Sequence, residues 1–166
     1  MRIIGIDPGY EKIGIAVLEK EDNQKEVLVY SDCFKTSREL LFTERLKLIS
    51  KEVEKIIKKF KPEGLAIENL FFKNNQKTGM RVAEVRGAVI NIALSKNLFV
   101  REFTPIQIKV GVTGYGRSDK KQVISMVKNL IKIDSNKKED DEFDAIAVAL
   151  TSIASEKMFQ GNKKRK

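Results

Sequence analysis

The first seventeen residues constrain the fold more than any other stretch, because they describe two strands joined by a tight turn. An apolar run over 3–6 is typical of a buried strand, and it ends at the carboxylate of Asp7. Pro8 and Gly9 favour a turn, and a second apolar run over 13–17 can pair back as a hairpin. An aspartate at the end of a central strand suits a metal ion or a phosphate, although Asp7 could also only cap the turn.

The composition is that of one soluble domain, with 42% hydrophobic and 33% charged residues among 166. The sequence contains no run of 18 apolar residues, and its N-terminus lacks the apolar core of a signal peptide. Its single cysteine, Cys33, cannot form an internal disulfide, which suits a reducing compartment. We therefore expect a cytoplasmic protein that has no membrane partner.

The chain contains no histidine, and this excludes several kinds of active site. Ser-His-Asp and Cys-His catalysis are impossible, and the usual zinc ligands are missing. A catalytic metal would have to be held by oxygen atoms, which favours Mg²⁺ or Mn²⁺.

The net charge of +9 suggests a nucleic-acid partner, because basic surfaces release counterions when they neutralise phosphates. Residues 162–166 supply four of these charges and leave +5 on residues 1–161. Surplus lysines that only keep the protein soluble are the alternative. We expect a single domain over 1–157 and a basic, flexible tail over 158–166.

Apolar periodicity predicts a mixed five-stranded sheet flanked by four helices, which is an α/β fold. Loops are expected over 69–77 and 104–117, the second because it holds Pro105 and three glycines. The expected strands are 3–7, 13–17, 27–34, 64–68 and 98–103, and the expected helices are 37–60 capped by Ser37, 78–96, 119–132 with a capping box of Asp119 and Gln122, and 140–156.

The helix expected over 78–96 is apolar on more than one side. Such a helix is either deeply buried or shared with a partner chain.

Four carboxylates stand at positions where the predicted elements can bring them together. Asp7 and Glu68 each end an expected strand, and parallel neighbours would present both at one edge of the sheet. Asp141 and Asp144 lie one turn apart on the last helix, although Asp141 could serve only the helix dipole. Four such charges stay ionised only with a positive charge between them. Two divalent cations roughly 3.5–4 Å apart meet that need, and they would activate a water for displacement at phosphorus.

The segments GIDPGxxxxGIAV, AIENLFF, TPIQIKVGVTGYGRSDKKQV and DEFDAIAVAL together resemble the RuvC family of Holliday-junction resolvases, over about residues 2 to 155. The resemblance implies an RNase H-like fold, a homodimer and a Mg²⁺-dependent endonuclease that makes paired nicks in strands of like polarity at a four-way DNA junction. It also raises a branch-migration helicase complex as a partner. The implied ligands of two Mg²⁺ ions, or of Mn²⁺, are Asp7, Glu68, Asp141 and Asp144. Many members of the family carry a histidine at the position of Asp141.

The resemblance also assigns residues that contact DNA. Phe71 matches a family aromatic near the cleaved bond, and Lys109 and Lys120 match basic residues near the active site. The alternatives are that Phe71 packs inward and that both lysines are merely solvated. The full set expected to bind DNA is Phe71, Lys73, Lys77, Lys109, Arg117, Lys120 and Lys121.

Other functions fit parts of the sequence. GIDPG also resembles the phosphate loop of actin-like ATPases, but those need two domains and more residues than this chain has. Residues 111–118 nearly match a P-loop, except that Arg117 replaces the lysine. An RNase H-like nuclease that acts on RNA or on other branched DNA and a non-catalytic junction-binding protein remain as alternatives. Metal-dependent cutting distinguishes the nucleases from the binding protein.

Overall fold

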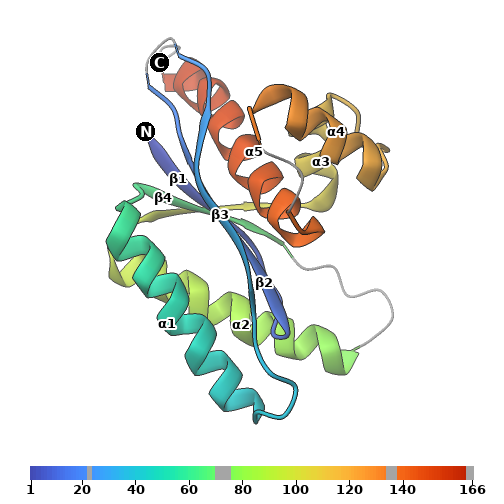
Figure 1. Ribbon diagram of the computed structural model, residues 1–166. Coiled ribbons are helices and arrows are strands. Elements are labelled where there is room, and N and C mark those ends of the chain that lie inside the picture. Colours follow the sequence, from blue (N-terminus) through green and yellow to red (C-terminus); the bar gives the residue numbers. More distant parts are fainter. Residues whose placement is uncertain (22–23, 70–75, 134–137, 164–166) are drawn as a thin grey trace.

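A computed structural model describes residues 1–21, 24–69, 76–133 and 138–163, and Figure 1 shows one twisted sheet with helices on both faces. The strands lie in the order β3-β2-β1-β4-β5; β1 to β3 are antiparallel neighbours, and β4 and β5 run parallel to β1. The predicted mixed five-stranded sheet is therefore confirmed. Its strands are β1 (Arg2–Asp7), β2 (Lys12–Glu19), β3 (Val27–Lys35), β4 (Gly64–Glu68) and β5 (Phe99–Phe103).

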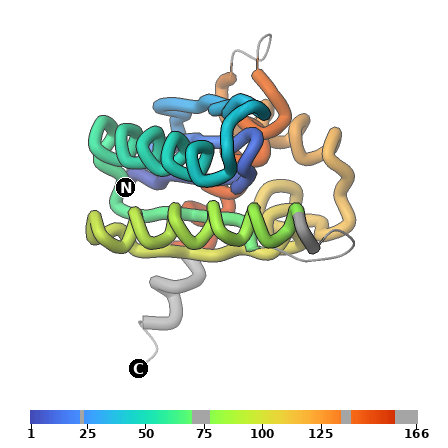
Figure 2. The backbone as a smooth tube through the Cα atoms, turned by 90° about the horizontal axis from the view of Figure 1, so that it is seen from below, coloured from blue at the N-terminus to red at the C-terminus, as the bar shows by residue number. Residues whose placement is uncertain are grey.

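Two helices cover one face of the sheet and three cover the other. On the first face, α1 and α2 lie side by side, as Figure 2 shows from below. On the second face, α5 crosses the central strands and packs against α3 and α4 (Figure 1). The helices are α1 (Phe42–Phe60), α2 (Gln76–Ser95), α3 (Pro105–Thr113), α4 (Lys120–Leu130) and α5 (Asp140–Lys163).

Alternation along β1 gives each face its own core. Ile4 and Ile6 belong to the cluster under α1 and α2, whereas Ile3 belongs to the cluster under α5. All three isoleucines are fully buried. The central strand is thus apolar on both sides, as the sequence predicted from its unbroken apolar run.

Two glycines let α5 lie directly on the sheet. A Cβ atom at Gly5 would stand 2.3 Å from the carbonyl oxygen of Ala145, and one at Gly14 would stand 2.0 Å from that of Asp141. Both distances are far below van der Waals contact, so any side chain at these positions would push the helix away. These glycines therefore fix the height of the first turns of α5 above β1 and β2.

The prediction of a loop over 104–117 is wrong for the first part of this segment, which forms α3. The Thr104 hydroxyl accepts the N–H of Gln107 at 3.2 Å, and the Gln107 side chain accepts the N–H of Thr104 at 2.8 Å. Pro105 takes the first helical position, where its missing N–H costs nothing. The capping box outweighed the glycines, of which Gly114 ends the helix at a φ of 77°.

The helix expected from Ser37 begins later, at Phe42. The Ser37 hydroxyl instead accepts the N–H of Glu39 at 3.2 Å and stabilises a turn, while the Glu44 carboxylate accepts the N–H of Leu41 at 2.9 Å. The capping box of Asp119 and Gln122 is confirmed at the start of α4.

Two other helix boundaries differ from expectation. The second helix begins at Gln76, two residues early, and α5 continues past Glu156 to Lys163. The division between a domain over 1–157 and a basic tail over 158–166 stays a prediction.

Candidate active site

Asp7 and Glu68 lie at the same edge of the sheet because they end adjacent parallel strands. Ile6 of β1 pairs with Ile67 of β4, so the next residue of each strand is one of the two carboxylates. Both side chains are partly exposed. The sequence predicted this arrangement, and the register of the two strands brings it about.

Asp141 and Asp144 reach the same region from α5. The close approach at Gly14 seats the backbone of Asp141 over β2, and Asp144 follows one turn later. Asp144 lines a pocket of about 230 Å³ together with Glu68. The fold therefore brings four carboxylates from three separate segments of the chain into one region.

Burial, and then the closeness of the negative charges, raises the pKa values of three of these carboxylates. Burial raises the pKa of Asp7 to about 7, and the negative charges of Asp144, Glu68 and Asp141 add to the effect. Burial and the charge of Asp144 raise the pKa of Glu68. The pKa of Asp144 is also raised, chiefly by burial, although its hydrogen bond with Lys120 opposes the shift. The site therefore holds more negative charge than its own cations balance.

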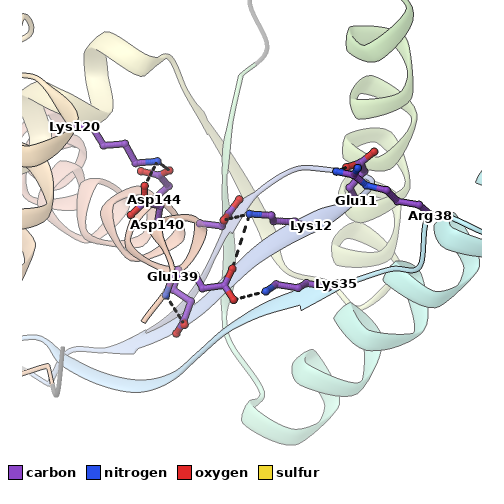
Figure 3. A network of polar contacts seen from close by, with 10 residues as sticks. Glu11, Lys12, Lys35, Arg38, Lys120, Glu139, Asp140 and Asp144 are labelled. Carbon is purple, nitrogen blue, oxygen red and sulfur yellow. Dashed lines mark hydrogen bonds and ion pairs between the residues drawn. The ribbon is translucent and has the colours of Figure 1, made fainter. Parts of the chain in front are cut away.

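Two lysines approach this cluster from opposite sides (Figure 3). Lys120 Nζ lies 3.0 Å from Asp144 Oδ2 and 3.3 Å from Asp140 Oδ2. Lys12 Nζ lies 3.4 Å from Asp141 Oδ2 and 3.9 Å from Glu139 Oε2, and Lys35 also pairs with Glu139. Each helix-borne aspartate of the site is thus paired with a lysine.

The carboxylates are close but do not yet converge on a point. In the described ranges, the one trio of ligand-type side chains whose atoms all lie within 4.8 Å of one another is Cys33, Glu139 and Asp141. The side chain of Asp141 therefore faces β3 and Lys12 as well as Asp7.

The pocket beside Glu68 and Asp144 also receives basic side chains. Lys109 from α3 and Lys120 from α4 line it, and its floor is apolar. The sequence predicted both lysines near the carboxylates but placed Lys109 on a loop. The apolar lining consists of Pro105, Ile108, Val123, Ala147 and Val148.

The other residues expected to bind DNA are placed less centrally or not at all. Arg117 lies exposed in the turn between α3 and α4, and Lys121 lines a different pocket, with Tyr115 and Met126. Phe71 and Lys73 lie outside the described residues, as does the side chain of Lys77 in the first turn of α2.

Sequence reasoning did not identify Lys12, Glu139 or Asp140 as part of the site. Lys12 pairs with a residue 129 positions away, and no local pattern marks such a contact. For Glu139 and Asp140, the acidic run that precedes Phe143 was a signal, but the run itself does not tell which acids face the sheet.

No helix in the described part of the chain has the length and apolar character to cross a membrane. The family model described as "Crossover junction endodeoxyribonuclease RuvC" matches residues 3–152. Curated relatives with that name include those of Finegoldia magna, 43% identical over 95% of both chains, and Thermosipho melanesiensis, 45% identical over 90% of this chain and 94% of the relative.

A solved structure gives the same result for the fold. The structure described as Thermus thermophilus RuvC in complex with Holliday junction substrate is 29% identical, has a TM-score of 0.89 and covers 96% of each chain.

Proposed function

This chain belongs to the RuvC family of crossover junction endodeoxyribonucleases, and we propose that it resolves four-way DNA junctions by metal-dependent paired nicks in strands of like polarity. The observation that carries this proposal is the meeting of Asp7 and Glu68, at the ends of adjacent parallel strands, with the first turns of α5. Nuclease chemistry without histidine needs such a group of oxygen ligands.

The residues present fit a hard divalent cation. Carboxylate oxygens are its preferred ligands, and burial together with neighbouring negative charge raises the pKa values of Asp7 and Glu68. Asp7, Glu68, Asp141 and Asp144 would hold two Mg²⁺ ions, or Mn²⁺ in their place. When bound, such ions supply the positive charge that promotes hydrolysis of a phosphodiester bond.

The protein's own cations would hold the DNA strand. Lys109 and Lys120 line the pocket next to Glu68 and Asp144, so a phosphate seated there would meet two ammonium groups beside the carboxylates. Phe71, on the segment that follows β4, would stack on an unpaired base near the cleaved bond. Lys73, Lys77, Arg117, Lys121 and the basic residues after 157 would extend the contact along the backbone.

We place the homodimer contact on α2. Met80 and Leu94 of this helix keep 63% and 56% of their surface exposed, and Val85 and Val89 face the core. A helix that is apolar on both sides buries its second side most readily against another copy. Light scattering at micromolar concentration tests this, and a monomer would contradict it. We also propose a helicase complex as a partner and a cytoplasmic location.

The test is cleavage of a synthetic four-way junction, compared with linear duplex and with structured RNA, with and without Mg²⁺. We expect paired nicks in the junction only, and only with the metal. Cutting of RNA or of simple branched DNA would indicate a different nuclease on the same fold. Metal-independent binding without cutting would indicate a junction-binding protein.

A further inference from the structure

We propose that Lys12 is a positioning residue that holds Asp141 in the metal-free site and competes with the divalent cation for this carboxylate. The inference rests on the proposed function, because it takes Asp141 to be a ligand. It adds a residue that neither the resemblance nor the sequence pattern singled out.

The position of Lys12 follows from the hairpin. It is the first residue of β2, directly after the turn that leaves Asp7, and its cross-strand partner on β3 is Lys35. The two lysines approach the start of α5 from neighbouring strands (Figure 3). Lys12 donates to Asp141 Oδ2 at 3.4 Å and lies 3.9 Å from Glu139, and Lys35 donates to Glu139.

The two lysines pair with different carboxylates. Lys35 has Glu139 as its acidic partner in these contacts, so the Lys12 ammonium is left to pair with Asp141. A lysine beside a carboxylate oxygen and a divalent cation on the same oxygen exclude each other through charge repulsion.

The backbone of Asp141 is packed closely against β2. Its carbonyl oxygen stands where a Cβ of Gly14 would be, so the first turn of α5 is seated against β2. A rotation of the side chain would release the carboxylate from Lys12 and Glu139 without moving this turn. Lys12 thereby holds the Asp141 carboxylate in place until a cation replaces the ammonium group.

The contact is weak enough to be displaced. The Lys12 side chain is 51% exposed, and an ion pair with an exposed lysine is small and screened by salt. Removing the ammonium should therefore tighten divalent-cation binding about two- to fivefold. The loss of one positive charge near the cluster acts in the same direction.

Lys120 holds Asp144 differently. It contacts two aspartates at 3.0 and 3.3 Å and also lines the pocket proposed for the DNA phosphate. Its replacement would change DNA binding as well as the metal site. Lys12 does not line that pocket, so its effect can be isolated in the protein without DNA.

The experiment is a Mn²⁺ titration of the full chain in the absence of DNA. Binding is monitored by calorimetry or by the electron paramagnetic resonance of unbound Mn²⁺. The variants are Lys12→Gln, Lys12→Arg, which retains the charge, and Lys47→Gln. Lys47 is an exposed lysine of α1, on the opposite face of the sheet, and its replacement causes the same change in net charge.

We expect Lys12→Gln to bind Mn²⁺ about two- to fivefold more tightly than the wild type, with Lys12→Arg and Lys47→Gln close to the wild type. The Mg²⁺ concentration for half-maximal junction cleavage should fall in parallel. Equal or weaker binding by Lys12→Gln, in a variant whose thermal unfolding matches the wild type, would overturn the inference. A wild type that binds no Mn²⁺ would instead refute the proposed metal site itself.

Discussion

The four carboxylates of the candidate site fall into two pairs that the molecule holds in different ways. Asp7 and Glu68 end strands of the sheet, whereas Asp141 and Asp144 extend from the start of α5. Each helix-borne aspartate accepts a hydrogen bond from a lysine. Within the part of the chain that the structure describes, neither strand-borne carboxylate has such a bond, and the pKa of both is raised by burial.

The strand-borne and helix-borne carboxylates therefore differ in whether a lysine neutralises them. The sheet supplies two carboxylates at fixed places whose negative charge is not balanced, and the helix supplies two that already have counterions. An incoming cation would therefore gain most from the strand pair and would displace lysines from the helix pair.

The largest effect should come from the strand pair. Asp7→Asn should abolish metal-dependent cleavage, because it removes a ligand at the centre of the cluster. Junction binding should persist or strengthen, because negative charge near the phosphates decreases. Cleavage assays and a binding titration measure both effects, with Asp32→Asn on β3 as the matched control. Loss of binding together with cleavage would indicate that Asp7 is structural.

The pH dependence of stability should distinguish the pairs next. Burial raises the pKa of Asp7 from its ordinary value of 3.8 to about 7 in the folded protein, so between these values the unfolded state releases this proton first. Without metal, this residue therefore costs stability that grows from pH 4 to pH 7 and is constant above. Asp7→Asn should remove that cost and stabilise the metal-free protein at pH 8 by on the order of 2–4 kcal/mol.

Urea unfolding of both proteins at several pH values measures this difference. The advantage of Asp7→Asn should vanish below about pH 3, where both the folded and the unfolded wild type hold the proton. Added Mn²⁺ should stabilise the wild type and leave the variant nearly unchanged. A constant difference across the pH range would contradict the cause given for the raised pKa.

The helix pair should respond to displacement of α5. Gly14→Ala would place a Cβ atom 2.0 Å from the Asp141 carbonyl oxygen, so we expect a loss of about 1–3 kcal/mol in unfolding free energy and reduced cleavage. Gly87→Ala on α2 is the matched control, because its Cβ would meet no atom of the described residues within 4 Å. That variant should be neutral or more stable by up to about 1 kcal/mol. Equal effects of the two would show that α5 is not seated by Gly14.

The smallest effect should come from the rim of the pocket. Lys109→Gln should weaken junction binding a few-fold, and it should lower the slope of log affinity against log salt by about 0.9 if Lys109 neutralises one phosphate. Cleavage at saturating DNA should change little, since neither pair of carboxylates is altered. Lys47→Gln serves as the control of equal charge. An unchanged slope would remove Lys109 from the contact.

The strand pair was predictable from sequence and the details of the helix pair were not. Apolar runs that end in Asp7 and Glu68 mark buried strands, and parallel pairing then brings their ends together. The seating of α5 depends on Gly5 and Gly14. In the sequence alone, nothing distinguishes these two residues from ordinary turn or strand glycines. Likewise, Lys12 and Asp141 are 129 residues apart, so their contact is a property of the folded chain.

α3 shows a different reason for failure. Pro105 and three glycines suggested a loop, while the capping box formed by Thr104 and Gln107 favoured a helix. The number of helix-breaking residues predicted a loop wrongly because their positions also matter. Proline at the first turn and glycine at the end are normal parts of a helix. Lys109 consequently comes to the pocket on a rigid element.

The seating of α5 on Gly14 involves the main chain of Asp141, and its side chain takes no part in it. The fold therefore specifies where residue 141 lies and leaves open which functional group it carries. Different donor atoms can be exchanged at this one place while the scaffold around it stays the same. The metal preference of such a protein can then change through single replacements at this position, without a change in the fold.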